Sequence, residues 1–323
     1  MGMLINGVWT DDDGARLSQG GAFVRPESAF RDRVTADGTS GYRAEPGRYH
    51  LYCAVSCPWA HRTLIMRKLK GLDDAVSLSI VGPPEQQRGW EMTGRSGAYP
   101  DVLHGAHFLY EVYAKAKPDY TGRVTVPVLW DKQSGRIVNN ESPEIIRMMN
   151  SEWNAFAKRE VPDLYPPELR ARIDEWNELI YRTVNNGVYR AGFATEQKAY
   201  DEAVRGVFAT FDRLESHLAT NRYLCGARLT EADIRLFPTL VRFDVAYHGH
   251  FKCNLRRLVD YANLWAYTRD LYQLPGVGET VDLDAIRINY YRNQIKVNPS
   301  RVVAIGPVLD FMAPHGRERI GAH

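Results

Sequence analysis

The sequence predicts an α/β domain followed by an all-helical domain. Over residues 49–81 an apolar segment, a helix-like segment and a second apolar segment follow one another, which is the pattern of a β-α-β unit. Beyond residue 162, apolar residues recur at spacings of three and four, as on the buried faces of helices. A length of 323 residues suits two domains. We therefore expect an N-terminal arm, an α/β domain and a helical domain with a C-terminal extension, over residues 1–45, 46–155 and 162–323.

The composition argues against several classes of protein. A formal net charge of +2 with no long basic run gives no reason to expect nucleic acid or a membrane surface as a partner. Four cysteines without a pairing pattern suit a reducing compartment, and nothing suggests a metal site. No N-terminal signal is visible, and no segment approaches the ~18 apolar residues of a membrane span. We expect a soluble, cytoplasmic protein.

The first elements follow from local composition. Residues 10–45 are rich in Gly, Ser, Asp and Arg, which predicts an arm with little regular structure. A strand over residues 49–55 then leads into a helix over 58–69, with Gly71 as a plausible stop. A second strand over residues 76–81 completes the unit, and its two strands should be parallel.

Cys57 lies immediately before this helix and is followed by Pro58. Proline suits the first helical position, because its missing N–H would have no partner there. The cysteine then lies over the exposed N–H groups at the positive end of the helix dipole. Thioredoxin-like folds present a reactive thiolate in this way, with its pKa lowered from about 8.5 into the range of about 3.5–7.5.

Cys57 looks like a single reactive thiol rather than half of a redox pair. Ala60 occupies the position of a second cysteine in a C-x-x-C motif. Cys53, four strand residues upstream, would have its Cα about 13 Å away, whereas a disulfide needs about 4.4–6.8 Å. We interpret Cys53 as a buried strand residue, with an auxiliary thiol as the alternative, and Cys225 and Cys253 as structural.

The rest of the α/β domain includes a proline within a strand. Residues 82–120 look like a loose connection, and strands are expected over 124–130 and 136–139. In thioredoxin-like folds, the strand beside the cysteine carries a cis proline whose neighbouring backbone pairs with a peptide-like ligand, a role that Val126-Pro127 fits. An edge proline without a ligand is the alternative.

Glu141-Ser142-Pro143 marks the start of another helix, with Ser142 as the N-cap and Pro143 at the first position. One interpretation is a capped helix and nothing more. The other is an anion site, in which Ser142 and the exposed N–H groups hold a carboxylate while Glu141 pairs with an ammonium. The γ-glutamyl end of glutathione carries both charges.

Two rows of apolar residues at helical spacing, here called stripes, and one helix-capping pattern predict the helical domain. Both stripes should be core: Ile173, Trp176, Ile180 and Val184, then Val207, Phe211, Leu214 and Leu218. Thr230 and Asp233 have the spacing of a capping box, which concerns folding rather than chemistry. A further helix is expected over residues 258–273.

Taken together, these features resemble a cytosolic glutathione transferase, and more closely the glutathionyl-hydroquinone reductases, or xi class. The resemblance covers nearly the whole chain, including its C-terminal extension. The motifs that carry it are Cys57-Pro58-Trp59-Ala60-His61-Arg62-Thr63, Asn185-Asn186-Gly187-Val188-Tyr189, Ala191-Gly192-Phe193-Ala194, Leu229-Thr230-Glu231-Ala232-Asp233-Ile234-Arg235-Leu236, Val241-Arg242-Phe243-Asp244, His250-Phe251-Lys252-Cys253, Val297-Asn298-Pro299 and Ile305-Gly306-Pro307.

The resemblance implies roles for individual residues. Cys57 matches the catalytic cysteine, and Tyr189 and Tyr290 match two tyrosines that point their hydroxyls at the hydroquinone; Tyr291 is the alternative to Tyr290. The positions that match the glutathione site are Trp90, Arg123, Val126, Glu141 and Ser142. Cys53 departs from the aliphatic residue expected there, as does Glu91-Met92 from a more aromatic continuation.

The implied reaction is removal of glutathione from a glutathionyl-hydroquinone through a Cys57–glutathione mixed disulfide, with glutathione as the co-substrate. The resemblance also implies a homodimer. The nearest alternative is an omega-like thiol transferase or dehydroascorbate reductase that uses the same cysteine. A non-catalytic scaffold of the same fold is the alternative from another class, and it predicts a Cys57 of ordinary pKa.

Overall fold

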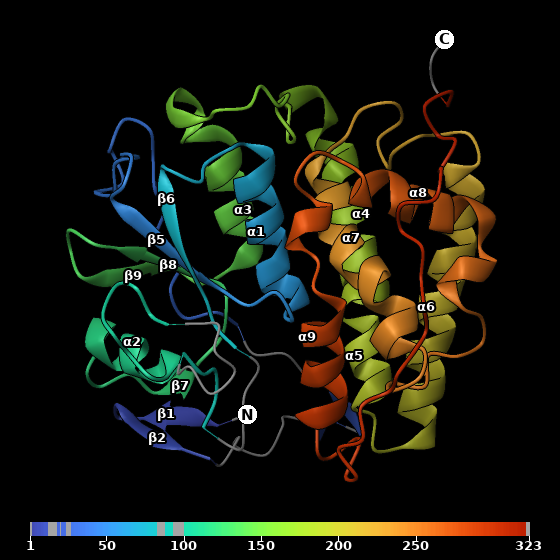
Figure 1. The fold of residues 1–323 in the computed structure, drawn as a ribbon, viewed down its shortest axis with the longest axis horizontal. Helices are drawn as coiled ribbons and strands as arrows, with labels where there is room; N and C mark the ends of the chain where they lie inside the picture. The colour runs from blue at the N-terminus through green and yellow to red at the C-terminus, as the bar shows by residue number, and fades with distance from the viewer. Residues whose placement is uncertain are drawn as a thin grey trace. The chain divides into compact units, whose positions relative to one another are not determined.

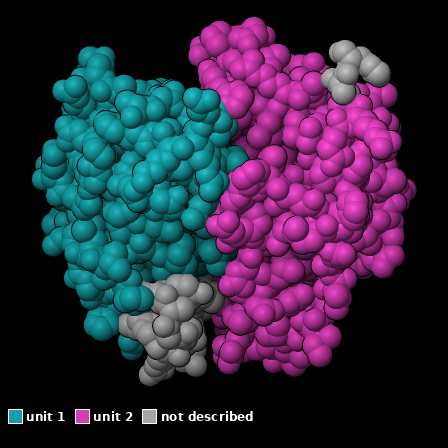
Figure 2. Space-filling model, turned by 45° about the horizontal axis from the view of Figure 1, so that its top comes forward, with its two compact units in different colours: residues 1–16, 26–161 teal, residues 17–25, 162–323 magenta. Residues whose placement is uncertain are grey.

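The structure, a computed structural model, describes residues 2–11, 18–19, 21–23, 27–82, 88–92 and 100–320. The chain divides into two compact units (Figure 1, Figure 2). Unit 1 comprises Met1–Arg16 and Pro26–Val161, and unit 2 comprises Leu17–Arg25 and Pro162–His323. The predicted fold class, a mixed α/β region followed by a helical region, is confirmed. The predicted boundaries of the arm and the two domains stay predictions.

Unit 1 is built on a four-stranded sheet in the order β6-β5-β8-β9. Strand β5 is buried along its whole length and pairs in parallel with β6 and antiparallel with β8. The parallel pair confirms the predicted β-α-β unit. The four strands are Tyr49–Cys53 (β5), Val76–Ile80 (β6), Val128–Asp131 (β8) and Arg136–Asn139 (β9).

Two helices of unit 1, α1 (Pro58–Leu69) and α3 (Ser142–Ser151), pack side by side (Figure 1). A smaller sheet in the order β2-β1-β7 forms from short strands. These are Met3–Ile5 (β1), Val8–Thr10 (β2) and Gly122–Arg123 (β7), and a 3-10 turn, Asn154–Phe156 (η2), follows α3.

Some predictions for unit 1 are wrong in detail. Residues 82–120 contain a helix, α2 (Leu109–Ala116), whose buried Leu109, Val112 and Tyr113 repeat at helical spacing. The strand expected over residues 124–130 begins only at Val128, directly after Pro127, which has no N–H to donate to a neighbouring strand.

Unit 2 is helical apart from a short hairpin of Ser18–Gln19 (β3) and Ala22–Phe23 (β4). Its longest helix, α6, packs against α5 and α8. Both predicted stripes are buried. The α-helices are Arg170–Ile180 (α4), Gly187–Gly192 (α5), Gln197–Leu218 (α6), Glu231–Arg242 (α7), Ala262–Tyr272 (α8) and Leu283–Arg287 (α9). Three 3-10 turns are Pro167–Leu169 (η3), Leu258–Asp260 (η6) and Gly278–Thr280 (η7).

In the described part of unit 2, three single turns of π-helix interrupt or extend the helices: Tyr181–Asn185 (η4), Phe243–Tyr247 (η5) and Ile288–Arg292 (η8). Each widens the helix by one residue relative to an α-turn. The capping box of Thr230 and Asp233 at the start of α7 is confirmed. The helix expected over residues 258–273 is broken at Tyr261, whose extended backbone separates η6 from α8.

The last described segment, residues 293–320, runs without helix or strand and is anchored by a buried arginine. The Arg317 guanidinium donates to the backbone oxygens of Leu218, Asn221 and Arg222, at and just beyond the end of α6. It therefore satisfies carbonyl groups that the helix itself cannot pair. Among the described residues, no helix is long and apolar enough to cross a membrane.

Candidate active site

Cys57 lies at the N-cap of α1 and is half-buried. Its backbone is extended, Pro58 begins the helix, and the Cys57 carbonyl accepts the first helical bond from the His61 N–H at 2.9 Å. The sulfur therefore lies at the positive end of the α1 dipole, as the Cys-Pro pair predicts. The Cys57 Sγ is 4.0 Å from the carbonyl oxygen of Val126.

Val126 brings a second backbone segment to the thiol. The peptide bond between Val126 and Pro127 is cis, as expected from the sequence, while pairing of the Val126 backbone with a ligand stays a prediction. The Val126 side chain is buried, and its carbonyl faces Cys57. Unit 1 thus combines a thiol at a helix N-terminus with an adjacent cis-proline backbone, which suits binding of a peptide-like ligand beside the sulfur.

The other three cysteines are buried thiols. Cys53 ends β5 with no exposed surface, and its Sγ donates to the Ala60 carbonyl at 3.3 Å. Burial raises the pKa of Cys253 to about 12 and also raises that of Cys225. All four cysteines lie in the described residues, and none forms a disulfide. Cys57 is therefore the thiol that solvent and substrates can reach.

Glu141 and Ser142 lie at the start of α3, one position later in the helix than predicted. Glu141 is the N-cap, Ser142 is the first helical residue and Pro143 is the second, because the Glu141 carbonyl already accepts the first helical bond. The Glu141 carboxylate accepts a bond of 2.8 Å from the Ser28 hydroxyl. Ser142 is buried at the positive end of the helix, which suits a carboxylate ligand.

Arg62 is a charged residue near Ser142 that the sequence interpretation did not single out. Its guanidinium is buried, lies 3.5 Å from the Ser142 hydroxyl and stacks 4.6 Å from the centre of the Trp59 ring. Arg62 follows Cys57 by five residues on α1, so the helix brings the thiol and a positive charge into one region of unit 1.

Trp90 and Arg123 lie in unit 1 on separate segments. Trp90 is buried in the short described segment 88–92, and its carbonyl accepts the N–H that begins α2, from Leu109 at 3.0 Å. Arg123 is half-buried on β7, where it pairs with Met3 of β1. Their roles in glutathione binding stay predictions.

The two predicted tyrosines of unit 2 meet in a cluster of three. The hydroxyl oxygens of Tyr189 and Tyr290 are 2.6 Å apart, and those of Tyr247 and Tyr290 are 2.8 Å apart. Tyr247 was not predicted, since nothing local in the sequence pairs it with the other two. Tyr291 packs instead against His250, with ring centres 4.9 Å apart. Tyr290, not Tyr291, therefore joins Tyr189.

The tyrosine cluster is buried beside a positive charge. Burial raises the pKa of Tyr247 and Tyr290 well above 10, and the charge of Arg242 partly offsets this rise. Arg242 is itself fully buried at the end of α7, where it donates to the Pro238 carbonyl at 2.8 Å. Both phenols therefore stay protonated at neutral pH and can act as hydrogen-bond donors.

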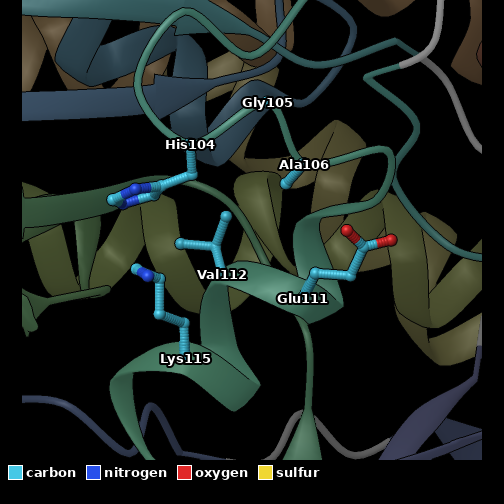
Figure 3. A pocket seen from close by; sticks show the side chains of 6 residues that line it. All are labelled: His104, Gly105, Ala106, Glu111, Val112 and Lys115. Carbon is cyan, nitrogen blue, oxygen red and sulfur yellow. The ribbon is translucent and has the colours of Figure 1, made fainter.

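An open pocket at the start of α2 contains none of the predicted site residues (Figure 3). It is lined by His104, Gly105, Ala106, Glu111, Val112 and Lys115. Figure 3 shows the acidic and the basic side chain on either side of Val112. The described residues hold no group of His, Cys, Asp or Glu side chains suited to a metal ion.

Comparison with known proteins places both units in one family. A family model of the glutathione S-transferase N-terminal domain matches residues 56–152, and one of the C-terminal domain matches residues 197–270. Glutathionyl-hydroquinone reductase YqjG of Escherichia coli is 54% identical over 98% of this chain and 99% of its own. Glutathionyl-hydroquinone reductase PcpF of Sphingobium chlorophenolicum is 52% identical over 95% and 96%.

Solved structures agree with these relatives. A xi-class glutathione transferase from Natrialba magadii superposes with a TM-score of 0.93 at 49% identity, covering 99% of this chain and 98% of its own. The glutathione-bound structure of YqjG from Escherichia coli gives a TM-score of 0.90 at 51% identity, covering 98% and 99%.

Proposed function

The chain belongs to the glutathionyl-hydroquinone reductases, the xi class of the glutathione transferases, and we propose that its Cys57 thiolate carries their reaction. The observation that supports this most directly is the placement of the Cys57 sulfur at the N-terminus of α1, opposite the Val126 carbonyl and the cis proline. A thiolate is stabilised there by the helix dipole and remains half-exposed for attack.

The reaction proceeds in two exchanges. The Cys57 thiolate attacks the sulfur that joins glutathione to the aromatic ring. During this attack the ring is in its keto-like tautomer, in which the proton of one hydroxyl has moved to the ring carbon that carries the sulfur. The sulfur–carbon bond breaks, its electron pair reaches the ring oxygen as the ring regains its aromaticity, and that oxygen takes up a proton to give the hydroquinone. The thiolate of a second glutathione then attacks the mixed disulfide, which releases oxidised glutathione and restores the Cys57 thiolate.

Glutathione is held in unit 1 through its peptide-like backbone and its charged γ-glutamyl end. The Val126 backbone pairs with the former, while Ser142 and the N-terminus of α3 hold the γ-glutamyl carboxylate and Glu141 its ammonium group. The buried Arg62 adds positive charge near that carboxylate. Trp90 and Arg123 complete the site.

Tyr189 and Tyr290 donate hydrogen bonds to the ring oxygens of the hydroquinone. Carbon is a poor leaving group from sulfur, so the ring needs a keto-like form that can accept the electron pair. Aimed donors stabilise the charge that then develops on oxygen, most strongly where water is excluded. The reaction requires reduced glutathione, which fits a cytoplasmic setting, and we expect a homodimer, which sedimentation would measure.

The test is steady-state turnover of a simple glutathionyl-hydroquinone with glutathione, comparing wild type with Cys57→Ser and with Cys225→Ala as the control. We expect rapid release of hydroquinone, loss of turnover in Cys57→Ser and retention in Cys225→Ala. An inactive wild type that still reduces a small glutathione mixed disulfide would instead indicate a general thiol transferase. A wild type that forms no mixed disulfide at Cys57 would indicate a scaffold.

A further inference from the structure

Ser28, on the N-terminal arm, contacts the carboxylate to which the proposed function assigns the γ-glutamyl ammonium of glutathione. Its hydroxyl oxygen is 2.8 Å from Oε2 of Glu141 and 3.4 Å from the backbone oxygen of Asn140. An ionised carboxylate only accepts hydrogen bonds, so Ser28 is the donor, and the shorter distance directs its one proton to Glu141. The other carboxylate oxygen, Oε1, accepts no hydrogen bond from the described residues and reaches solvent, so a ligand can bind it.

The backbone of the arm places Ser28 beside this carboxylate. The arm pairs with β9, the edge strand of the main sheet of unit 1, around one isolated antiparallel bridge. The Asp32 N–H donates to the Val138 carbonyl at 3.0 Å, and the Asn140 N–H donates to the Phe30 carbonyl at 3.1 Å. Because the pairing is antiparallel, each residue back along the arm faces one further toward α3. Ser28 therefore lies beside the first residues of that helix.

Buried side chains fix the same register. The Asn140 Oδ1 accepts the Phe30 N–H at 3.1 Å, and its Nδ2 donates to the hydroxyl of the fully buried Tyr113 at 3.1 Å. The Phe30 ring packs edge-on against the Tyr113 ring, with centres 5.8 Å apart. The place of the arm is thus set by contacts that do not involve the Ser28 hydroxyl. Removal of that hydroxyl should leave the arm where it is.

We propose that Ser28 is a positioning residue for glutathione, whose hydroxyl holds the Glu141 carboxylate so that its other oxygen meets the γ-glutamyl ammonium. A glutamate side chain otherwise samples many rotamers, and affinity is lost when a ligand must select one of them. The Ser28 hydroxyl makes this selection before the ligand arrives. The ligand in this inference rests on the proposed function, but its binding can be measured without turnover.

The negative charge of Glu141 is kept for the ligand. Arg31, three residues along the arm from Ser28, forms its ion pair with Glu144, and its Nε lies 2.9 Å from both oxygens of that carboxylate. Among the described residues, none forms an ion pair with Glu141. A hydroxyl is neutral, so it orients a carboxylate without competing with an ammonium as an arginine would.

The test compares two ligands that differ only in the ammonium group. S-Methylglutathione cannot form a mixed disulfide, and its des-amino analogue carries hydrogen in place of the γ-glutamyl ammonium. Isothermal titration calorimetry gives the Kd of each ligand for wild type, Ser28→Ala and Ser28→Thr. Ser40→Ala is the matched control, because Ser40 is an exposed serine of the same arm. Wild type should bind S-methylglutathione at least about tenfold more tightly than the analogue.

In Ser28→Ala, this preference should fall about three- to fivefold, because only the ligand with an ammonium uses the oriented carboxylate. Affinity for the des-amino analogue should stay within about twofold of wild type. Ser28→Thr retains a hydroxyl and should retain the preference, as should Ser40→Ala. A purely structural role in holding the arm would instead weaken both ligands equally.

The remaining outcomes separate this role from the proposed function. An unchanged preference in folded Ser28→Ala, or equal weakening of both ligands, would overturn the role of Ser28 and leave the reductase intact. A wild type without any preference would overturn the role of Glu141, and that of Ser28 with it, whatever its turnover. A wild type that releases no hydroquinone, but whose preference falls in Ser28→Ala, would overturn the proposed function and retain this one.

Discussion

Cys57 is half-buried at the start of α1, whereas Cys53 and Cys253 have no exposed surface. Burial alone raises the pKa of Cys253 to about 12, so its thiolate is scarce at neutral pH. Reactivity of a thiol follows its thiolate fraction and its access to solvent. One chain thus holds one thiol suited to attack and several that are chemically silent.

Alkylation should therefore distinguish the four cysteines. With limiting iodoacetamide at pH 7 and native protein, Cys57 should be modified at least about tenfold faster than Cys53, Cys225 or Cys253. Peptide mass spectrometry gives the rate at each site, and urea-unfolded protein, in which all four should react alike, is the control. Comparable native rates at Cys57 and Cys253 would contradict the burial argument.

His50 should make stability depend on pH. Burial lowers its pKa from 6.5 to about 4, although Asp101 opposes the shift. The unfolded chain then binds more protons between these values, so stability present above pH 6.5 is lost as pH falls toward 4. A shift of this size corresponds to about 3 kcal/mol.

The free energy of urea unfolding measures this effect. His50→Asn should flatten the loss of stability between pH 6.5 and 4 by up to about 1.4 kcal/mol per pH unit, relative to wild type. The exposed His107 provides the matched control, since His107→Asn should leave the slope as it is. If the free energy of unfolding of His50→Asn changed with pH as steeply as that of wild type, the prediction would be wrong, because His50 would then already be charged in the folded protein over this pH range.

At the scale of elements, the start of α7 depends on one carboxylate. The Asp233 oxygens accept bonds from the Thr230 N–H at 2.8 Å and hydroxyl at 3.0 Å, the Leu224 N–H at 2.9 Å and the Tyr267 hydroxyl at 2.7 Å. Asp233 is fully buried. If its carboxylate were removed, solvent could therefore not accept the hydrogen bonds of these four donors. The cap therefore also joins α7 to α8, which carries Tyr267.

Removal of the Asp233 carboxylate should lower the free energy of unfolding by more than removal of an ordinary N-cap side chain does. Asp233→Ala should lower the free energy of unfolding by about 3 kcal/mol or more, because it strands several buried donors. Thr230→Ala should cost about 1 kcal/mol, and the exposed Thr220→Ala should be near neutral. Chemical denaturation followed by circular dichroism measures all three; equal costs for Asp233→Ala and Thr220→Ala would exclude the proposed role of the cap.

Elements with strong local signals could be predicted from the sequence. Helix α1 and strand β9 have the predicted bounds, since proline fixes the first turn of α1 and β-branched residues dominate β9. Helix α2 was missed because Gly and Pro on both sides suggested a loop, although Leu109 and Val112 have helical spacing. The break at Tyr261 depends on how α8 packs, which no local pattern reports.

The candidate site could be predicted only in part, because some of its contacts depend on packing that no local sequence pattern reports. The position of Cys57 at a helix start follows from the neighbouring Pro58, whereas the cis bond at Pro127 was expected from the pattern of thioredoxin-like folds. The meeting of Tyr189, Tyr247 and Tyr290 depends on positions separated by 43 and 101 residues along the chain. Only the folded helical unit brings these hydroxyls together.

At the scale of the molecule, the C-terminal tail is part of the helical unit. The Arg317 guanidinium is 1% exposed and donates to the backbone at and beyond the end of α6. It also lies over the Tyr267 ring, 5.8 Å from its centre. One side chain therefore connects the end of the chain to two helices, α6 and α8.

Arg317→Met should release the tail and weaken the helical unit. The stranded carbonyls predict a loss of about 3 kcal/mol in the free energy of unfolding. Limited proteolysis should cut residues 293–316 faster in this variant than in wild type, whereas the exposed Arg319→Met should behave like wild type. If Arg317→Met resisted protease as wild type does, other contacts would hold the tail.

The three π-turns should make this chain sensitive to insertion or deletion of single residues within them. Removal of one residue from Phe243–Tyr247 would turn η5 back into ordinary α-helix. Residues after the deletion, Tyr247 among them, would rotate by about 100° about the helix axis and shift by about 1.5 Å along it. An insertion or deletion that a surface loop absorbs without harm would thus separate the tyrosine hydroxyls. We expect these turns to tolerate substitution of their exposed side chains but no change in residue number.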